Sequence, residues 1–377
     1  MEPTLDGIGI LTQPLGKAGV TPLSNITKIV SSIYQRVCVI TGDEGYRYLQ
    51  NDNNIEVANI ESRPVCGELR RIVVNCFQQA RMALLIVTRF RDIRIWIFFI
   101  GGESAMLPML VSKVFRKRVV LVLAGFPSKI VRIHDDPLSG FLEIASRINL
   151  SLSNSIVAYS KNVAKERNLG KHSRKIEFLG EHIVDVSCFK PERKLADRER
   201  IVGYVGNLSV IKGIPNLMKA MSIVHEEDDG VKFIIAGEGE LEKYILELIS
   251  DLKLSSYVSF SGWIPHDRLA EHFNRLRLVV LPSLTEGLPN VMLEAMGCGT
   301  PVLACSVSAI PDIIRDRENG FLLKSDSPEC IAKNIKIALD YPQIDLVAAE
   351  ARTYVVERFE LKKVVERWKH LLKRMDQ

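Results

Sequence analysis

The sequence is poor in several residue patterns, and each absence excludes a class of protein. Its seven cysteines are scattered with no CxxC pair among them, which argues against a disulfide framework or a zinc site. No apolar run approaches the roughly 18 residues that a membrane span requires, and aromatic residues are only 7% of the 377. The balanced charge and the lack of repeats exclude disorder, collagen and coiled coil. A globular chain of about two domains is left.

No export signal precedes the first expected strand. Residues 1–6 are acidic and lead directly into the strand-like residues 7–12, with neither a basic region nor a long apolar core between them. We therefore expect a cytoplasmic protein.

The net positive charge of the sequence lies in its first half. Residues 1–190 hold 25 Lys+Arg and 17 Asp+Glu, a net +8, whereas residues 191–377 hold 25 and 28, a net −3. Within the first half, apolar residues recur at helical spacing from Leu69 to Leu84, with arginines at other positions. This pattern is typical of helices that lie on anionic lipid, here at the inner face of the membrane, although a core-facing helix with a solvated polar face would also produce it. The basic residues lack interleaved aromatics, so no nucleic acid is expected.

Short apolar strands alternate with helix-period segments in both halves of the chain, which predicts parallel sheets built from βαβ units. A charged stretch without apolar periodicity, residues 190–200, separates the two series and is interpreted as a linker. We predict an α/β fold of two doubly wound domains, 1–190 and 191–355, with ligands at the carboxyl ends of the strands. The helical tail, 356–377, has an apolar face that we expect to pack back on the first domain. In order, the expected strands are residues 7–12, 37–41, 55–60, 95–100, 119–124, 156–159, 201–205, 231–236, 258–261, 278–282 and 300–304.

The most informative segment is residues 285–301, TEGLPNVMLEAMGCGTP. A strand ends at Pro282, a loop carries Glu286, and Pro289 suits the first turn of a helix. That helix starts at the strand's carboxyl end, so its free N–H groups and positive dipole end can receive an anion. Glu294 has two acceptor oxygens and suits a vicinal diol such as a ribose. The pattern predicts a site for an anionic ligand with hydroxyl groups; the alternative is a well-capped βαβ unit whose glutamates face water.

This string resembles the signature of the retaining GT-B glycosyltransferases of family 4, the glycosyl transferases group 1. That signature has two glutamates separated by seven residues, followed by Ala-Met-x-x-Gly-x-Pro. The resemblance is strong over residues 201–323 and much looser before residue 190. It implies the GT-B fold, in which two Rossmann-like domains face a cleft. The second domain would bind a nucleotide-sugar donor and the first domain would bind the acceptor.

The resemblance also implies roles for single residues. Glu286 would contact the donor sugar and take part in catalysis, and Glu294 would bind the ribose of the nucleotide. These roles agree with the independent interpretation of an anion at a helix start beside a diol-binding carboxylate. The pocket for the sugar and the diphosphate would be lined by Gly287, Leu288, Pro289 and Asn290.

A second match is YVGNLSVIKG at residues 204–213, where a strand and a glycine turn lead to a lysine just before a helix. The Lys212 ammonium can neutralise charge on a leaving diphosphate, so we assign it a catalytic and donor-binding role. The family commonly has arginine directly after the glycine Gly206, where this sequence has Asn207. We therefore expect weaker diphosphate binding or an arginine supplied from elsewhere.

Two departures from the family pattern fall in the first half of the chain. Gly16 and Gly19 stand where the family places a Gly-Gly loop near the diphosphate and the acceptor, and an ordinary glycine turn is the alternative. The family usually carries a histidine at the end of the strand that corresponds to residues 119–124, and this sequence has none there. His134 is close in sequence and is our candidate for that catalytic position.

Weaker matches complete the expected donor site. Gly237 lies in a Gly-x-Gly turn after an expected strand, and Glu242 at the third glycine position excludes a dinucleotide fingerprint. Trp263 and Ile264 lie in a loop that the family places near the nucleotide base.

Together these observations predict a glycosyltransferase of the hexosyltransferase type. It would move a hexose or related sugar from a nucleotide diphosphate sugar to a hydroxyl group of a glycan, lipid-linked or small-molecule acceptor, with retention of configuration. The sequence has no Asp-x-Asp motif, so we expect neither a metal ion nor a further cofactor. Two alternatives stay open: a GT-B sugar nucleotide epimerase, and a non-catalytic sugar-nucleotide-binding subunit, which Asn207 and Gly125 favour.

Overall fold

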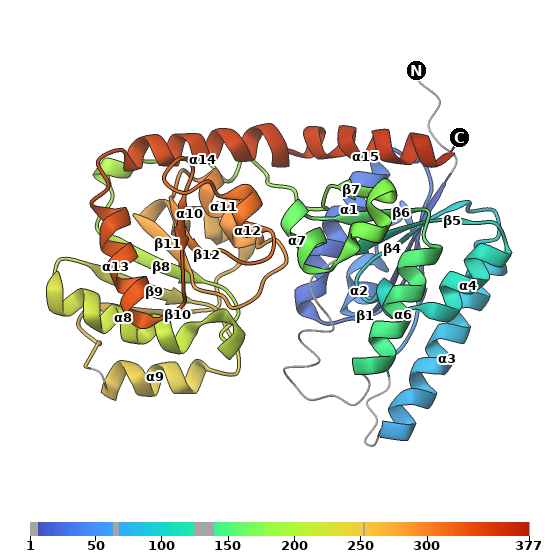
Figure 1. The fold of residues 1–377 in the computed structure, drawn as a ribbon, viewed down its shortest axis with the longest axis horizontal. Helices are drawn as coiled ribbons and strands as arrows, with labels where there is room; N and C mark the ends of the chain where they lie inside the picture. Colours follow the sequence, from blue (N-terminus) through green and yellow to red (C-terminus); the bar gives the residue numbers. More distant parts are fainter. Residues whose placement is uncertain (1–6, 63–67, 124–138, 252, 377) are drawn as a thin grey trace. The chain divides into compact units, whose positions relative to one another are not determined.

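The computed structural model describes residues 7–62, 68–123, 139–251 and 253–376. These described residues form two compact units, one within the ranges 1–182 and 362–377 and one within the range 183–361. Each unit is built on one parallel sheet with helices on both faces (Figure 1). The predicted fold class, two doubly wound α/β domains, is confirmed.

The first unit holds a seven-stranded sheet in the order β3-β2-β1-β4-β5-β6-β7. The chain reverses its direction across the sheet between β1 and β4, which makes this point the place where a doubly wound fold binds ligands. The strands are β1 (Ile8–Leu15), β2 (Val37–Asp43), β3 (Ile55–Asn59), β4 (Ile95–Phe98), β5 (Arg118–Leu123), β6 (Ser155–Ala158) and β7 (Ile176–Phe178). The helices are α1 (Val20–Ser31), α2 (Glu44–Leu49), α3 (Glu68–Val87), α4 (Met106–Val114), α6 (Ser139–Leu152), α7 (Lys161–Glu166) and α15 (Leu361–Asp376).

The second unit repeats the arrangement with six strands in the order β10-β9-β8-β11-β12-β13. Its reversal lies between β8 and β11. The strands are β8 (Ile201–Val205), β9 (Lys232–Ala236), β10 (Val258–Gly262), β11 (Leu278–Leu281), β12 (Val302–Cys305) and β13 (Phe321–Leu323). The helices are α8 (Ile214–Glu227), α9 (Glu242–Asp251), α10 (Leu269–Arg275), α11 (Asn290–Gly297), α12 (Ile310–Ile313), α13 (Pro328–Leu339) and α14 (Ile344–Phe359).

Close packing between strands and their neighbours explains several small residues. In the first sheet, a Cβ atom at Gly9 would lie 2.5 Å from the ring of Trp96, which is fully buried on β4. In the second sheet, a Cβ atom at Gly203 would lie 2.2 Å from Leu276. Both central strands therefore need glycine at these positions, because protein interiors leave no spare volume.

The carboxyl-terminal helix α15 belongs to the first unit from Lys362 onward. Its apolar face is buried, and the indole of Trp368 donates a hydrogen bond to the Gly180 carbonyl oxygen at 2.9 Å. Arg374 forms an ion pair with Glu177 of β7 at 2.8 Å. Among the described helices, none combines the length and the apolar composition needed to cross a bilayer.

Candidate functional site

The loops that follow β8, β9, β10 and β11 are joined by backbone hydrogen bonds. The Gly206 N–H group donates to the Ala236 carbonyl at 3.0 Å, and the Gly237 N–H group donates to the Gly262 carbonyl at 2.7 Å. Across the reversal point, the Leu284 N–H group donates to the Ile211 carbonyl at 2.9 Å. These hydrogen bonds hold the four loops together at the carboxyl edge of the second sheet.

Two glycines let these loops approach backbone to backbone. Gly237 has φ +141°, and a Cβ atom there would lie 1.8 Å from the Gly206 carbonyl oxygen. Gly213 has φ +72°, and a Cβ atom there would lie 2.1 Å from the Pro282 carbonyl oxygen. Any other residue would force the loops apart and adopt a strained backbone conformation.

Lys212 and Glu286 meet across the reversal point. Lys212 comes from the loop after β8, Glu286 comes from the loop after β11, and the Lys212 ammonium lies 2.7 Å from each carboxylate oxygen. The Ser283 hydroxyl donates to the same carboxylate at 2.6 Å. The Glu286 side chain is 9% exposed and that of Lys212 is 23% exposed, so the pair faces a limited amount of solvent. Ser283 was not predicted, although it stands only three residues before Glu286.

The loop that carries Glu286 is fixed from the next strand connection. The Glu286 N–H group donates to the Ser308 hydroxyl at 3.4 Å, and the Ala309 N–H group donates to the Gly287 carbonyl at 3.4 Å. The predicted pocket residues follow directly: Leu288 is 7% exposed, and Pro289 is the N-cap of α11, which begins at Asn290.

Two helices begin at this edge without a side-chain cap. Pro289 before α11 and Gly213 before α8 make no side-chain hydrogen bond to the first N–H groups of their helices. Both helices start next to the Lys212–Glu286 pair in the chain. Uncapped N–H groups at the positive ends of two helix dipoles favour a bound anion such as a diphosphate.

Glu294, about one turn into α11, is buried and paired. Its side chain is 8% exposed and accepts a hydrogen bond from the Nε2 side of the His266 ring at 2.9 Å. His266, which is 64% exposed, lies in the loop after β10 and also packs edge-on against Phe189. Sequence reasoning missed this histidine, which lies three residues after Trp263. Trp263 is 63% exposed, and the neighbouring Ile264 is half-buried.

Tyr204 supports the loop that carries Asn207. The Tyr204 hydroxyl donates to the Asn207 carbonyl at 2.8 Å, while the Asn207 side chain is exposed. Burial, and then the charge of Glu286, raises the pKa of Tyr204 above its ordinary value. The phenol therefore stays protonated and acts as a fixed hydrogen-bond donor beneath the loop.

A small cavity of about 160 Å³ opens at the ends of β11, β12 and β13. Ser283, Cys305 and Ser306 are among its lining residues. Because the Ser283 hydroxyl bonds to Glu286, the cavity lies next to that carboxylate. Burial raises the pKa of the Cys305 thiol to about 12. The thiol stays protonated at neutral pH and lacks the character of a nucleophile.

The first unit has a larger cavity, of about 810 Å³, at its own reversal point between β1 and β4. Glu103, which is buried, accepts hydrogen bonds from Arg167 at 2.8 Å and from Ser146 at 3.1 Å. The amide of Gln13 on β1 donates to the Ser104 hydroxyl at 2.6 Å. Amide, hydroxyl, carboxylate and guanidinium groups thus converge on one cavity, and sequence reasoning identified none of them.

His172 lines the same cavity. Burial, followed by the charges of Lys175 and Lys171, lowers its pKa, so the ring is neutral at pH 7. A neutral imidazole adds one donor and one acceptor to the polar lining.

Of the remaining predicted residues, Gly16 and Gly19 lie at the end of β1 in the first unit. Their φ angles are −77° and −82°, and the Gly19 N–H group donates to the Gly16 carbonyl at 3.0 Å. A Cβ atom at Gly16 would meet nothing within 4 Å. Neither position needs the conformational freedom of glycine. His134 and Gly125 lie outside the described residues.

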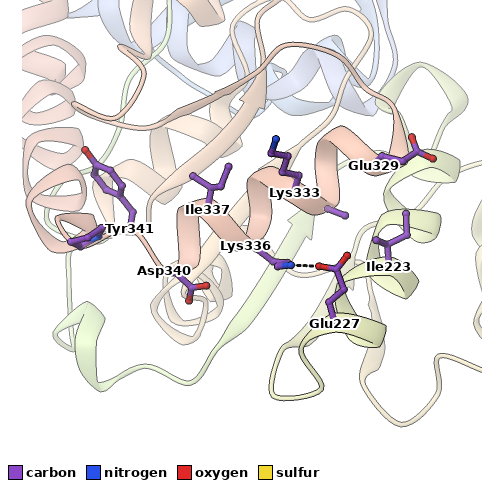
Figure 2. A pocket seen from close by; sticks show the side chains of 10 residues that line it. Ile223, Glu227, Glu329, Lys333, Lys336, Ile337, Asp340 and Tyr341 are labelled. Carbon is purple, nitrogen blue, oxygen red and sulfur yellow. Dashed lines mark hydrogen bonds and ion pairs between the residues drawn. The ribbon is translucent and has the colours of Figure 1, made fainter.

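A third hollow, of about 700 Å³, lies between α8 and α13 in the second unit. Figure 2 shows the side chains of Glu227 and Lys336 pointing toward each other there, joined by an ion pair. Asp340 on the rim pairs with Arg200 at 3.0 Å. None of its lining residues comes from the loops at the carboxyl edge, and two of its acidic side chains are held in ion pairs. We interpret it as the junction of two packed helices.

The described part of the chain contains no cluster of three His, Cys, Asp or Glu side chains that could hold a metal ion.

Comparison with known proteins finds similarity to glycosyltransferases. Residues 188–357, which lie within the second unit, match the family model described as glycosyl transferases group 1. An uncharacterised glycosyltransferase of Methanocaldococcus jannaschii is 31% identical over 172 residues, which is 45% of this chain and 44% of that protein. The N-acetyl-α-D-glucosaminyl L-malate synthase of Bacillus anthracis is 25% identical over 273 residues, 70% of each chain. The match thus spans less than half the length of the first of these relatives.

Structural similarity covers more of the chain than sequence similarity does. The crystal structure of Anabaena HepE in complex with UDP matches with a TM-score of 0.76 over 98% of this chain and 100% of that chain, at 17% identity. This likeness identifies the fold as GT-B.

Proposed function

We propose that this chain is a glycosyltransferase that takes a sugar from a nucleotide diphosphate donor and transfers it to an acceptor hydroxyl group. The observation that carries the proposal is the meeting of Lys212 and Glu286 across the reversal point of the second sheet, beside two uncapped helix starts. The family match over residues 188–357 covers all of these elements and supports it.

In the proposed mechanism, the donor diphosphate lies against the starts of α8 and α11. Charge that develops on the leaving diphosphate is stabilised by the Lys212 ammonium and by the backbone N–H groups. Lys212 has three N–H donors, so it can bind a phosphate oxygen while it stays bonded to Glu286. Glu286 then contacts the donor sugar, and the acceptor attacks from the same face through an oxocarbenium-like state. Neither a protein nucleophile nor a metal ion is part of the proposal.

Glu294 and Trp263 are proposed to hold the nucleoside. The Glu294 carboxylate has an acceptor oxygen besides the one bonded to His266, which suits a ribose hydroxyl. The exposed indole of Trp263 offers a stacking surface for the base. The HepE structure contains UDP, so uridine nucleotides are the first donors to test.

The acceptor is proposed to bind the first unit, in the polar cavity around Glu103 and Arg167. Mixed amide, hydroxyl and charged groups of this kind recognise hydroxyl-rich molecules, so a glycan or the head of a lipid-linked sugar suits the cavity. A lipid-linked acceptor would bring the chain to the inner face of the membrane.

The donor site can be tested by thermal unfolding with UDP, GDP, ADP and their sugar derivatives. Wild type is compared with Glu294→Gln and with Glu318→Gln, a control at an exposed glutamate. A ligand at 100 times its dissociation constant stabilises by roughly 2.7 kcal/mol, so we expect a clear rise in Tm with one base. That rise should disappear in Glu294→Gln and persist in the control.

Turnover separates the proposal from its alternatives. Transfer of the donor sugar to an added acceptor supports the glycosyltransferase. An epimerised donor formed without acceptor would identify an epimerase. Donor binding without transfer across a broad acceptor screen would identify a non-catalytic subunit, and no Tm shift with any nucleotide would refute the donor site itself.

A further inference from the structure

Helix α3 packs on the rest of the first unit through a face that includes a polar residue. Gln79 is 8% exposed, and its amide oxygen accepts the N–H group of Leu107, in the first turn of α4, at 3.0 Å. The same amide donates to the Ser104 carbonyl at 3.2 Å. Met82 and Ile86 continue this face and are 1% and 0% exposed. Gln79 thus binds the amino-terminal turn of α4 and fixes how α3 is rotated about its axis.

This rotation turns an apolar stripe of α3 toward solvent. Val73, Phe77 and Leu84 are 62%, 76% and 59% exposed, and Ala80 between them is also exposed. The spacing of four, three and four residues places all four side chains on one side of the helix. A helix whose only task was to cover the sheet would bury this stripe. The apolar periodicity of α3 therefore does not mark its core-facing side.

The neighbouring helix α4 adds a second exposed stripe. The two helices lie side by side at the outside of the first unit (Figure 1). Exposed large side chains follow helical spacing along α4 and end at the residue after it. They are Leu107, Leu110, Val114 and Phe115, with exposed fractions of 38%, 42%, 77% and 53%. We call these residues, with Val73, Phe77, Ala80 and Leu84, the α3–α4 apolar surface.

The charge of the same segment is strongly positive. Residues 69–118 contain ten Lys or Arg and two acidic residues, Asp92 and Glu103. Asp92 pairs with Arg36, and Glu103 is buried against Arg167. On the helical wheel, Arg70 and Arg81 border the exposed stripe of α3, and both are exposed.

We propose that the α3–α4 apolar surface docks on an anionic lipid bilayer. Several large apolar side chains exposed together mark an interaction site, and bordering arginines complement the negative surface of anionic lipid. A second copy of the chain fits less well, because a symmetric contact through this surface would bring the arginines of both copies together. The proposal does not depend on the proposed transferase activity and concerns a surface separate from the donor site.

The test is sedimentation of the full chain with lipid vesicles, measured without any nucleotide sugar. One set of vesicles is pure phosphatidylcholine and the other also contains phosphatidylglycerol. Val73→Ser combined with Phe77→Ser removes apolar contact, and Arg70→Gln combined with Arg81→Gln removes positive charge. Leu346→Ser changes a residue that is 56% exposed in the second unit and serves as the matched control.

Wild type and the Leu346→Ser control should bind the anionic vesicles, and added salt should weaken binding. Each double variant should bind about tenfold or more weakly, since each deleted anchor or charge lowers partitioning several-fold. All four substituted residues are exposed, so unchanged circular dichroism and Tm should show that the variants are folded. Light scattering after size-exclusion chromatography reports the oligomeric state in parallel.

Three results would overturn the proposal. The first is a folded wild-type chain that ignores anionic vesicles. The second is binding that the Val73/Phe77 variant leaves unchanged. The third is a dimer in solution that dissociates in the same variant, which would identify a second copy of the chain as the occupant of the surface.

Discussion

At the scale of single residues, the contact between Lys212 and Glu286 joins the loop after β8 to the loop after β11. The Lys212 ammonium lies 2.7 Å from both carboxylate oxygens of Glu286. We expect Lys212→Ala to lower kcat/KM by about 10²–10³, because charge on the leaving diphosphate loses its cation. Lys219→Ala, an exposed lysine seven residues later on α8, is the control and should keep its activity.

A double-mutant cycle with Glu286→Gln tests whether the two groups act as a pair. Residues in one contact should show non-additive losses, with the double variant about as impaired as the worse single one. Turnover of Lys212→Ala that equals wild type at subsaturating donor would remove the residue from the mechanism.

His272 on α10 gives the second unit a defined response to acid. Burial, and then the charge of Arg275, lowers the pKa of His272 to about 4, whereas an unfolded histidine titrates at roughly 6.5. Between these values the unfolded chain binds more protons, so stability is full above pH 6.5 and falls as the pH drops toward 4. The expected loss is about 3 kcal/mol.

Urea unfolding at several pH values measures this effect, compared with His272→Gln. The variant keeps a polar side chain but cannot titrate, so its free energy of unfolding should depend less steeply on pH over this window. Equal slopes for both proteins would show that His272 is not the responsible group.

At the scale of elements, the connections after β8 and β9 depend on the backbone contact at Gly237. We expect Gly237→Ala to destabilise the second unit by about 2 kcal/mol or more, because its Cβ atom would lie 1.8 Å from the Gly206 carbonyl oxygen at φ +141°. Donor binding should weaken with it. Gly16→Ala is the matched control, since φ is −77° and nothing lies within 4 Å of the new atom. Thermal melts measure the Tm of both variants, and an equal change in Tm for the two would contradict this account.

The central strands and the edge strands β3 and β10 were predictable from sequence, whereas the edge strands β7 and β13 were not. β4 and β11 are short apolar runs buried along their whole length, which is the signal of a parallel sheet. β7 and β13 were missed because each has only three residues, too few for a periodic pattern. The charged stretch 190–200 also contains a buried residue that its composition does not indicate. Arg198 is 6% exposed and donates to the Cys298 carbonyl.

The candidate site was predictable where its residues stand in a recognisable local string. Glu286 and Glu294 lie in one string, so spacing along a loop and a helix suggested their placement, and Lys212 stands in a second string before a helix. Their partners Ser283 and His266 carry no signal by themselves, since a serine or histidine in a loop is common and only the fold brings them to the glutamates. The outward stripe of α3 was likewise ambiguous, because periodicity locates an apolar face without saying what covers it.

At the scale of the whole molecule, the two units differ in how much sequence alone can say about them. The family match lies entirely within the second unit, whereas the likeness of fold covers 98% of the chain. The cavity of the first unit is assembled from residues as distant as Gln13, Glu103 and Arg167, which no local pattern connects. The family match therefore covers the proposed donor site and not the proposed acceptor site.

If donor and acceptor bind separate units, substitutions in the first unit should change acceptor recognition alone. We expect Gln13→Leu and Ser146→Ala to raise the acceptor KM several-fold, to about tenfold, because each removes a polar group from the cavity. The rise in Tm caused by the nucleotide should stay as in wild type. Arg47→Gln is the control, since this side chain is 71% exposed on α2 of the same unit and is not among the residues that line the cavity. A variant that lost the nucleotide response together with acceptor binding would show that the two sites are not separable, and an unchanged KM would move the acceptor out of this cavity.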